Sequence, residues 1–346
     1  MAMSALPPGI ENFLEAAGWS GARIVPLAGD ASFRRYFRVS RPQGTAVGGA
    51  QTPDNRAMLM HAPPPHEDPE PFLHVARWLS EHDMRAPRIL AADPPAGWVL
   101  IEDFGDDRMR DWLDDNPDAE TAAYEAAIDA LVKLHALPPG PFAPYDEQTY
   151  LREVGLFTEW YCPAADLEVD TLGFEQAWSD ALAPLIERQG DGVTVLRDYH
   201  AENIMLLGQP GENGPREQGL IDFQDALTGH PAYDLVSLLQ DARREVSPTL
   251  EAAMLARYVA QANPAGAATG DFDADYAVLG AQRNAKIVGI FTRLAKRDGK
   301  DRYLAMIPRV WAAMERDLAH PALAPVAAWF DANIPSATRQ NNGTQT

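Results

Sequence analysis

The sequence predicts an α+β protein with two lobes, a small β-rich N-terminal lobe and a larger helical C-terminal lobe. At 346 residues the chain is too long for one small hydrophobic core. Its apolar pattern also changes near residue 105, from short runs separated by Pro and Gly to longer stretches with helical spacing. We therefore expect lobes at 1–104 and 105–335, followed by a disordered polar tail at 336–346.

The N-terminal lobe should contain several strands with one helix inserted after the third. The helix is expected at 69–83, where a Pro-rich start precedes apolar residues on one helical face. The segment 41–55 has no periodicity and is expected to be a mobile hairpin loop. The expected strands are 22–29, 33–40, 56–62, 87–90 and 97–103.

The C-terminal lobe should be mainly helical, with two short β-rich segments at 193–208 and 219–226 that carry charged turns. The expected helical stretches are 108–116, 119–137, 146–161, 171–188, 231–242, 248–262, 271–297 and 302–317.

The composition excludes several classes of protein. A net charge of -21 argues against binding nucleic acid or an anionic membrane, because both attract basic surfaces. No apolar run is long enough to span a bilayer, and the N-terminus lacks the pattern of a secretory signal. Cys162 is the only cysteine, which excludes an intramolecular disulfide or a cysteine-based metal cluster, and it should fill a core position. We expect a cytoplasmic monomer.

The strongest chemical signal is LRDYHAENIML at 196–206. In protein kinases the pattern R-D-x-x-x-x-N places an Asp that accepts the proton of the acceptor hydroxyl and an Asn that binds Mg²⁺. Asp198 and Asn203 have this spacing. A second signal, GLIDFQDA at 219–226, places Asp222 after a buried strand, where it would bridge Mg²⁺ and the phosphates. In the third, GHPAYDLVSLL, Asp234 could brace the catalytic loop.

Each signal also has an ordinary structural explanation. A single R-D-x-x-x-x-N match arises by chance, Asp222 could cap a turn, and Asp234 could cap its own helix. His200 could be an ordinary hydrogen-bonded loop histidine. Three such segments in this order, with strands on both sides of the loop, favour the kinase interpretation.

Together LRDYHAEN, IDFQDA and GHPAYDL resemble the aminoglycoside-phosphotransferase-like kinases, whose fold is that of protein kinases. The resemblance implies ATP and Mg²⁺ as cofactors, with Asp198 as catalytic base and His200 near the transferred phosphate. It implies Asn203 and Asp222 as metal ligands. The segments GDASFRRYFRV, APPP, LIEDFGDD and FTRLAKRDGK are also similar to the N-acetylmuramate/N-acetylglucosamine anomeric kinases of bacterial cell-wall recycling. That narrower resemblance covers residues 10–335 and implies an amino-sugar substrate phosphorylated at its anomeric hydroxyl.

In this comparison GDASFRRYF would cover the phosphates, although the segment could equally be a plain hairpin turn. Backbone groups from Glu102 to Phe104 would hold the adenine, unless they simply end a strand. The sequence departs from the kinase pattern in one respect. Kinases usually place a Lys on the third strand, against the phosphates, but RAMLMHA has no Lys and offers Met60 or His61 in that neighbourhood. Either Arg34, Arg35 or Arg38 replaces it, or nucleotide affinity is weak. The expected nucleotide-binding residues are Gly29, Ser32, Arg34, Arg35, Glu102 and Phe104.

From Arg283 to Arg302 the chain carries seven Lys or Arg and only two acids. Several of these cations fall on one side of a helix, which is either a solvated face or a wall that binds the carboxylate of muramic acid. The candidate substrate-binding residues are Arg152, Arg283, Lys286 and Arg293. Two alternatives stay open: an aminoglycoside- or choline-type phosphotransferase, and a nucleotide-binding pseudokinase that does no chemistry.

Overall fold

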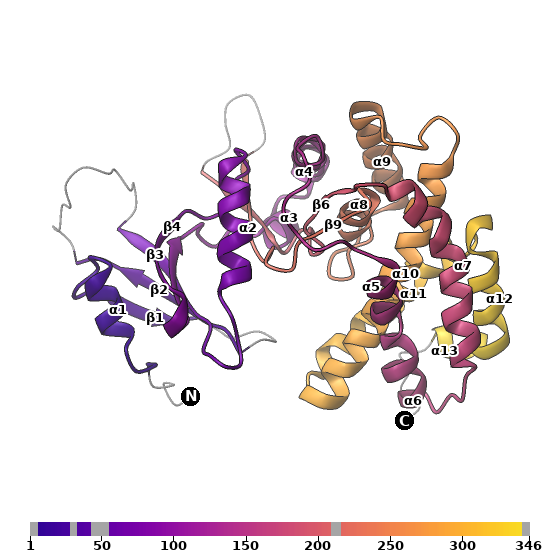
Figure 1. Cartoon of the computed structure of the whole chain (residues 1–346), viewed down its shortest axis with the longest axis horizontal. Helices are drawn as coiled ribbons and strands as arrows, with labels where there is room; N and C mark the ends of the chain where they lie inside the picture. Colours follow the sequence, from indigo (N-terminus) through magenta and orange to yellow (C-terminus); the bar gives the residue numbers. More distant parts are fainter. Residues whose placement is uncertain (1–5, 28–32, 43–54, 209–215, 341–346) are drawn as a thin grey trace. The chain divides into compact units, whose positions relative to one another are not determined.

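A computed structural model describes residues 6–27, 33–42, 55–208 and 216–340 of the chain (Figure 1). The chain divides into two compact units. The N-terminal unit comprises Met1–Asp107, Met205–Gln209 and Glu217–Asp225, and the C-terminal unit comprises the rest. The expected boundary at residue 104 is therefore close, but two later segments belong to the N-terminal unit. Hydrogen bonds hold them there, from Leu206 N to the Asp107 carbonyl (2.8 Å) and from Leu220 N to the Arg85 carbonyl (2.8 Å).

The N-terminal unit is built on a five-stranded sheet of order β1-β2-β3-β5-β4, in which all neighbouring strands are antiparallel. The later segments add a hairpin of β7 and β8, which form a separate two-stranded sheet. All five expected strands of the main sheet are present. The strands are β1 Arg23–Pro26, β2 Arg35–Ser40, β3 Arg56–His61, β4 Ile89–Asp93, β5 Trp98–Glu102, β7 Ile204–Leu207 and β8 Glu217–Leu220.

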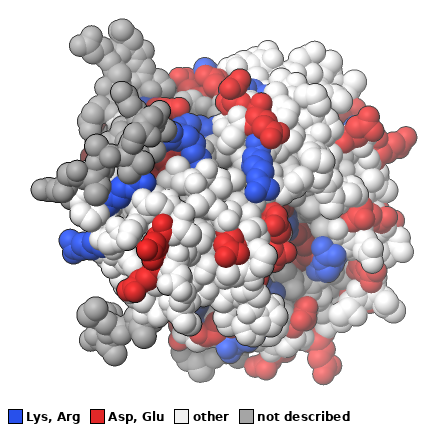
Figure 2. Space-filling model, turned by 60° about the vertical axis from the view of Figure 1, so that its left-hand side comes forward, with Lys and Arg blue, Asp and Glu red and all other residues white. Residues whose placement is uncertain are grey.

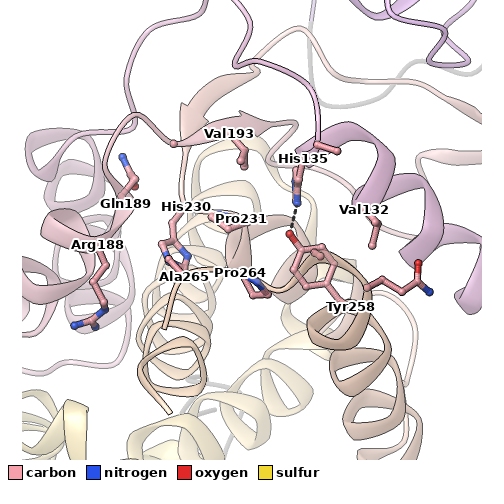
Figure 3. Close-up of a pocket in the computed structure, with 14 residues that line it drawn as sticks. Val132, His135, Arg188, Gln189, Val193, His230, Pro231, Tyr258, Pro264 and Ala265 are labelled. Atoms are coloured by element: carbon pink, nitrogen blue, oxygen red, sulfur yellow. Dashed lines mark hydrogen bonds between the residues drawn. The ribbon is translucent and has the colours of Figure 1, made fainter. Parts of the chain in front are cut away.

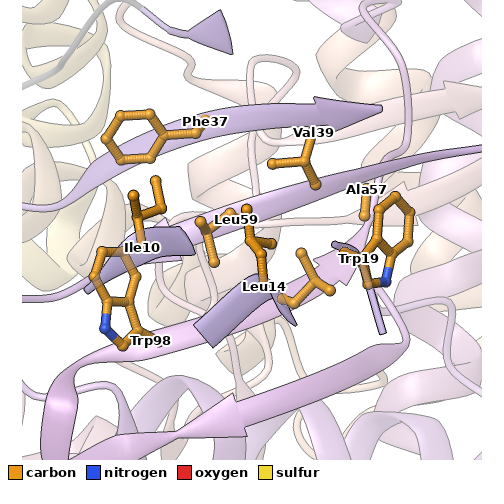
Figure 4. Packing of buried hydrophobic residues seen from close by; sticks show 9 residues of the cluster. Ile10, Leu14, Trp19, Phe37, Val39, Ala57, Leu59 and Trp98 are labelled. Carbon is orange, nitrogen blue, oxygen red and sulfur yellow. The ribbon is translucent and has the colours of Figure 1, made fainter. Parts of the chain in front are cut away.

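One face of this sheet packs on a helix that the sequence analysis did not anticipate, α1 (Ile10–Ala16). Period-2 alternation along β2, β3 and β5 places apolar side chains on this face. The Trp98 ring lies between Phe13 of α1 and His61 of β3, with ring centroids 5.9 Å and 4.0 Å away. The buried cluster, shown in Figure 4, consists of Ile10, Leu14, Trp19, Phe37, Val39, Ala57, Leu59, Trp98 and Leu100.

The expected helix after the third strand is α2 (Glu70–Glu81), which lies on the other side of the strands from α1 (Figure 1). Among its described residues, the N-terminal unit therefore contains two α-helices rather than the one expected. Phe72 of α2 stacks on Phe223, with ring centroids 5.2 Å apart, which anchors the segment after β8 to this helix. Most of the expected mobile loop, residues 43–54, lies outside the described residues.

The C-terminal unit is mainly helical, as expected, with the short strands β6 (Val193–Val195) and β9 (Leu227–Gly229) pairing antiparallel. Phe157–Tyr161 forms one π-helical turn within the region expected to be a single helix. The helices are α3 Met109–Asp115, α4 Glu120–His135, α5 Glu147–Val154, α6 Cys162–Ala164, α7 Thr171–Gln189, α8 Ala232–Leu239, α9 Pro248–Ala262, α10 Asp271–Asp298, α11 Ile307–Leu318, α12 Ala324–Asn333 and α13 Ser336–Gln340. Single 3₁₀ turns occur at Pro94–Ala96, Pro117–Ala119, Asp301–Met306 and Pro321–Leu323.

The expected disordered tail is wrong for its first residues, because 336–340 form α13. Tertiary contacts stabilise this short helix. Arg339 forms ion pairs with Glu315 (3.2 Å) and Asp331 (3.0 Å), and the Tyr161 hydroxyl donates to the Thr338 carbonyl (3.2 Å). Residues 341–346 lie outside the described part of the chain.

The long helix α10 lies at the centre of the C-terminal unit and carries buried polar residues as well as apolar ones. Asp275 pairs with Arg188 of α7, the Gln282 amide donates to the Tyr150 carbonyl (3.0 Å), and the Asn284 amide donates to Gln240 (2.7 Å). Gly289 allows a close approach, because a Cβ there would lie 2.4 Å from the backbone of Leu156.

The surface carries acidic and basic side chains interspersed on the face shown in Figure 2, rather than gathered in one continuous patch. Within the described ranges no helix is long and apolar enough to cross a bilayer. Cys162 is buried, as expected, and burial raises the pKa of its thiol to about 12.

Candidate active site

The segment 196–203 connects β6 to β7, and buried groups of α8 determine its backbone shape. Asp234 of α8 is 0% exposed and accepts hydrogen bonds from the N–H groups of Leu196 (2.7 Å) and Arg197 (2.8 Å). The Ser237 hydroxyl donates to the Arg197 carbonyl (3.1 Å). Arg197 has a φ of 70°, in the left-handed region that is unfavourable for a residue with a Cβ. Such a conformation persists because the surrounding contacts over-determine it.

The two acids of this region differ in their ionisation. Burial raises the pKa of Asp234 to about 7, against the effect of the two N–H donors. Burial would also raise the pKa of Asp198, but nearby positive charges outweigh it and lower that pKa below its ordinary value. Among the groups that lower it, His200 acts only in its protonated form, whereas Lys286, Arg283 and Arg197 carry the permanent positive charges. Asp198 is therefore an ionised carboxylate at neutral pH, able to accept a proton.

Asn203 is oriented by the same loop. Its side-chain nitrogen donates to the Asp198 carbonyl (3.0 Å), which leaves the side-chain oxygen as the atom that can ligate a metal. An amide oxygen is a hard donor of the kind that Mg²⁺ prefers. The loop thus holds the predicted base and one predicted metal ligand together.

His200 is buried, and its ring nitrogen Nε2 lies 3.2 Å from the Arg243 guanidinium. Arginine can only donate, so Nε2 accepts and the ring proton is on Nδ1. Burial lowers the pKa of His200, and the charge of Arg243 lowers it further. Arg243 is itself held by Glu202 (2.8 Å). The imidazole next to the catalytic loop is therefore neutral.

A buried acid, Glu153 of α5, forms a cluster with two cations beside this loop. It accepts hydrogen bonds from Lys286 of α10 (2.9 Å), from Arg197 and from the Tyr145 hydroxyl. Burial would raise the pKa of Glu153, but Lys286 and Arg197 lower it below its ordinary value. The ammonium of Lys286 also donates to the Tyr233 hydroxyl (3.1 Å).

The four predicted substrate-binding cations do not lie together. Arg283 is 4% exposed, and its Nη1 atom has no hydrogen-bond partner among the residues that the structure describes. The positive charges of Arg283 and Lys286 both lower the pKa of Asp198, so these two residues lie in its surroundings. Arg293 lies ten residues beyond Arg283 on α10, or about 15 Å along the helix axis. Arg152 is exposed on α5, beside a groove between α5 and α7.

In the N-terminal unit, Asp222 follows β8 with a φ of 60°, another left-handed residue that bears a Cβ. Its carboxylate is exposed and accepts a hydrogen bond from Gln224 (3.1 Å), while the next residue, Phe223, is buried on α2. Across the described ranges no three His, Cys, Asp or Glu side chains gather in a way that could hold a metal on their own. Taken singly, the carboxylate of Asp222 and the amide oxygen of Asn203 are hard-oxygen donors of the kind that Mg²⁺ accepts, and each stays a predicted ligand.

The expected nucleotide-binding residues have mixed outcomes. Gly29 and Ser32 lie outside the described residues. Arg34 is half-buried, whereas the Arg35 guanidinium lies over the Phe37 ring (5.2 Å from the centroid), on the face that packs against α1. Glu102 is already engaged, because its N–H donates to the Arg88 carbonyl (2.9 Å). Its carboxylate binds Arg85 (2.7 Å) and Arg88 (3.1 Å).

Phe104 also has a structural role in the described chain. Its ring lies under the Arg85 guanidinium (4.6 Å from the centroid) and against Gly219 of β8. A Cβ on Gly219 would lie 2.5 Å from that ring, so only glycine fits there. An adenine could therefore be held by the main chain after Glu102, rather than by the Glu102 N–H or the Phe104 side chain.

Two charged residues that contact this loop, Glu153 and Arg243, were not singled out in the sequence analysis. A signal for Glu153 was present, because Tyr150, Glu153 and Val154 have the i, i+3, i+4 spacing of one buried helix face. An acid on such a face requires a buried cation. Arg243 lies in a segment, DARREV, that carries no comparable pattern.

A cavity of about 310 Å³ in the C-terminal unit lies away from this loop and is lined by the ends of α4, α7 and α9 (Figure 3). The His135 ring and the Tyr258 hydroxyl are hydrogen-bonded there (2.8 Å). His230 lines the same cavity and binds Asp275 (3.2 Å). None of the predicted catalytic or metal-binding residues lines this cavity.

Comparisons with known proteins identify the family and the fold. A family model described as "Phosphotransferase enzyme family" matches residues 23–270. The chain is 38% identical to an N-acetylmuramate/N-acetylglucosamine kinase of Caulobacter vibrioides, over 95% of this chain and 96% of that protein. It is 37% identical to a protein of the same name from Pseudomonas aeruginosa, over 89% of each. A solved structure of aminoglycoside phosphotransferase APH(2'')-Ib with ADP is similar in fold, with a TM-score of 0.59, 11% identity and coverage of 91% of this chain and 100% of that one.

Proposed function

Because this chain belongs to the phosphotransferase enzyme family, we propose that it uses ATP to phosphorylate the anomeric hydroxyl of N-acetylmuramate and N-acetylglucosamine. The chain is an enzyme that transfers a phosphoryl group to an alcohol, with the protein-kinase-like fold of that family. The products would be the sugar 1-phosphates, and the cellular role would be peptidoglycan recycling in the cytoplasm. The names of the curated relatives support the choice of sugars. The ADP-bound structure with the same fold supports a nucleotide donor.

The observation that carries the mechanism is the ionised Asp198 on a loop braced by Asp234. Its carboxylate would orient the anomeric hydroxyl and accept its proton as the oxygen bonds to the γ-phosphorus of ATP. The bond from that phosphorus to the β–γ bridging oxygen breaks, and ADP leaves. His200 is neutral, and Arg243 donates to its Nε2 atom. Its Nδ1–H would be the donor in a hydrogen bond to the transferred phosphate, without adding a positive charge to the site.

Asn203 and Asp222 are the proposed ligands for Mg²⁺. When bound, the ion would neutralise negative charge on the phosphates. Asp222 contributes a full negative charge and Asn203 a neutral oxygen, so the two ligands differ in strength. Gln224 and Phe223 keep the Asp222 carboxylate in place from the N-terminal unit.

The lactyl carboxylate of N-acetylmuramate needs a cation, since the protein is acidic as a whole. Arg283 and Lys286 are the two predicted cations that surround Asp198, and Arg283 has an unpartnered Nη1 among the described residues. A carboxylate near the acceptor oxygen could reach them. Arg152 and Arg293 lie elsewhere on α5 and α10 and are weaker candidates.

The function is tested by ³¹P NMR of the products formed from ATP, Mg²⁺ and a panel of acceptors. We expect 1-phosphates of N-acetylmuramate and N-acetylglucosamine, and none from the methyl glycoside of N-acetylglucosamine, whose anomeric oxygen is blocked. Phosphorylation of the methyl glycoside would show that another hydroxyl is the acceptor.

The same panel separates the two alternatives. Turnover of kanamycin or choline, with neither sugar phosphorylated, would assign an aminoglycoside- or choline-type activity. The second alternative, a nucleotide-binding pseudokinase, arose from the missing third-strand Lys, but the kinase names of the relatives and the phosphotransferase family oppose it. ATP binding without phosphorylation of any acceptor is the result that a pseudokinase would give.

A further inference from the structure

The third strand of the N-terminal sheet, β3, has the sequence RAMLMH and offers no Lys to the nucleotide phosphates. Three arginines of the neighbouring segment, Arg34, Arg35 and Arg38, are the available substitutes. Strand geometry divides them, because successive side chains point to opposite faces of a sheet. Phe37 and Val39 of β2 belong to the cluster against α1, so Tyr36 and Arg38 point to the other face.

The register of β2 and β3 shows which face the missing Lys would occupy. Tyr36 lies opposite Met60 and Arg38 opposite Met58, whereas Phe37 lies opposite Leu59, a member of the cluster on α1. Met58 and Met60 therefore share the face away from α1 with Tyr36. His61 is excluded as a substitute, because its ring stacks on Trp98 on the α1 side (4.0 Å).

Two of the three arginines are excluded by their surroundings. Arg35 lies on the α1 face, over the ring of Phe37. Arg38 is on the correct face, but its guanidinium is held at the segment after β5. It binds Asp103 (2.7 Å), Asp106 (2.8 Å) and the Gly105 carbonyl (3.2 Å). Three acceptors that converge on one guanidinium make a structural clamp.

Arg34 has the surroundings that the phosphate-binding role requires. Its Nε atom is 3.1 Å from the carboxylate of Glu67, in the segment that leads into α2, and 14% of each side chain is exposed. The second carboxylate oxygen of Glu67 accepts the N–H of Phe33 (3.1 Å). Burial raises the pKa of the Tyr36 hydroxyl, Arg34 lowers it by charge and hydrogen bonding, and the carboxylate of Asp222 raises it. Arg34, Tyr36 and Asp222 are therefore close enough to affect one another.

We propose that Arg34 replaces the missing third-strand Lys as the cation that binds the nucleotide phosphates, and that Glu67 orients it. In protein kinases the third-strand Lys pairs with a Glu of the following helix. Arg34 and Glu67 would take the place of that pair, with the cation moved from β3 to the residue before β2. A guanidinium can hold two phosphate oxygens at once, which an ammonium does not do with the same geometry. This inference rests on the proposed use of ATP, but it does not depend on which sugar is the acceptor.

The test is the binding of ATP, ADP and adenosine to purified full-length variants, measured by calorimetry without an acceptor. In Arg34→Met we expect ATP affinity to fall about 10- to 100-fold, the loss of a charge-assisted hydrogen bond, while adenosine affinity stays within about twofold. Arg35→Met is the matched variant on the opposite face, and its ATP affinity should stay within about threefold. Unchanged ATP binding in Arg34→Met, or the larger loss in Arg35→Met, would overturn the proposal.

Two further variants separate phosphate binding from a structural role. Arg34→Lys retains the charge, so it should recover most of the ATP affinity that Arg34→Met loses. An equal loss in both would show that charge is not what matters. Once Arg34 is replaced by Met, Glu67→Gln should not weaken ATP binding further, because an orienting residue has nothing left to orient. Equal losses of ATP and adenosine affinity in Arg34→Met would assign Arg34 to the structure of the lobe.

These outcomes are distinct from the failure of the proposed function. A chain that phosphorylates no amino sugar can still show the expected ATP affinities. A chain that makes the sugar 1-phosphates can still show no role for Arg34.

Discussion

Asp234 in the C-terminal unit and Glu67 in the N-terminal unit each accept a backbone N–H from an arginine-containing segment, but their surroundings differ. Asp234 is 0% exposed and holds the backbone of Leu196 and Arg197. Glu67 retains 14% exposure and holds the Arg34 side chain and the Phe33 N–H. Breaking the first arrangement would leave buried polar groups without partners, whereas a partly exposed ion pair exchanges its partner at little cost.

The difference suits the two regions to different proposed roles. The loop that holds Asp198 is preorganised by buried hydrogen bonds, so it needs no rearrangement when an acceptor arrives. The cation of the N-terminal unit is held by an ion pair that can share its charge with an incoming phosphate. The three predictions below test this comparison, beginning with the largest expected effect and ending with the one confined to a single substrate.

The largest effect is expected for Asp198→Asn, which removes the proton acceptor and retains the size of the side chain. We expect kcat to fall by about 10²–10⁴, the usual contribution of a general base. ATP affinity should stay within about twofold, because the proposed phosphate-binding groups belong to the other unit. Single-turnover kinetics and calorimetry measure the two quantities. A kcat close to that of the wild type would refute the role of Asp198. Loss of ATP binding would contradict the assignment of phosphate binding to the N-terminal unit alone.

The second effect compares one proposed metal ligand from each unit. Asp222→Ala should raise the Mg²⁺ concentration for half-maximal activity by about 10- to 100-fold, because a charged ligand is lost. Asn203→Ala should raise it by about fivefold, the value of a neutral interaction worth about 1 kcal/mol. Activity titrated against Mg²⁺ measures both. Overlapping curves for the wild type and both variants would remove these residues from the metal site.

The third effect is confined to one substrate. Arg283→Met and Lys286→Met should lower kcat/KM for N-acetylmuramate about 10- to 100-fold more than for N-acetylglucosamine, which has no carboxylate. Arg152→Ala and Arg293→Ala serve as comparisons, since neither residue is among the groups named as lowering the pKa of Asp198. Thermal unfolding of each variant controls for the loss of the Glu153 cluster. Equal losses on both sugars in every variant would mean that the carboxylate is bound elsewhere or remains in solvent.

The sequence predicted the strands of the N-terminal unit because their alternation is a local signal. It could not separate Arg34 from Arg35, because the face of each depends on the register between β2 and β3. Membership of Asp222 in the N-terminal unit was also hidden, since it depends on hydrogen bonds distant in sequence, such as Leu220 N to the Arg85 carbonyl. Local patterns indicate elements, and tertiary pairing assigns them to a face or a unit.

The missed helices have the same explanation. In α1, Ile10 and Leu14 have helical spacing, but the helix spans only seven residues after a Pro-Pro-Gly segment and depends on the sheet for its stability. α13 lies in a polar segment and is held by the ion pairs of Arg339. The segment LRDYHAEN was singled out because the kinase pattern has a fixed spacing, whereas Glu153, the acid that binds Arg197 of this segment, belongs to no such pattern.

The buried polar side chains of α10 limit how this helix can be placed. A purely apolar helix can rotate or slide by one residue in a core with modest loss, since one methyl group replaces another. On α10 such a slip would separate Asp275, Gln282 and Asn284 from partners on three other segments at once. Each unpaired buried group would cost about 1–3 kcal/mol. These contacts therefore fix the rotation of α10 about its axis. As a result, Arg283 and Lys286 keep fixed positions relative to Asp198.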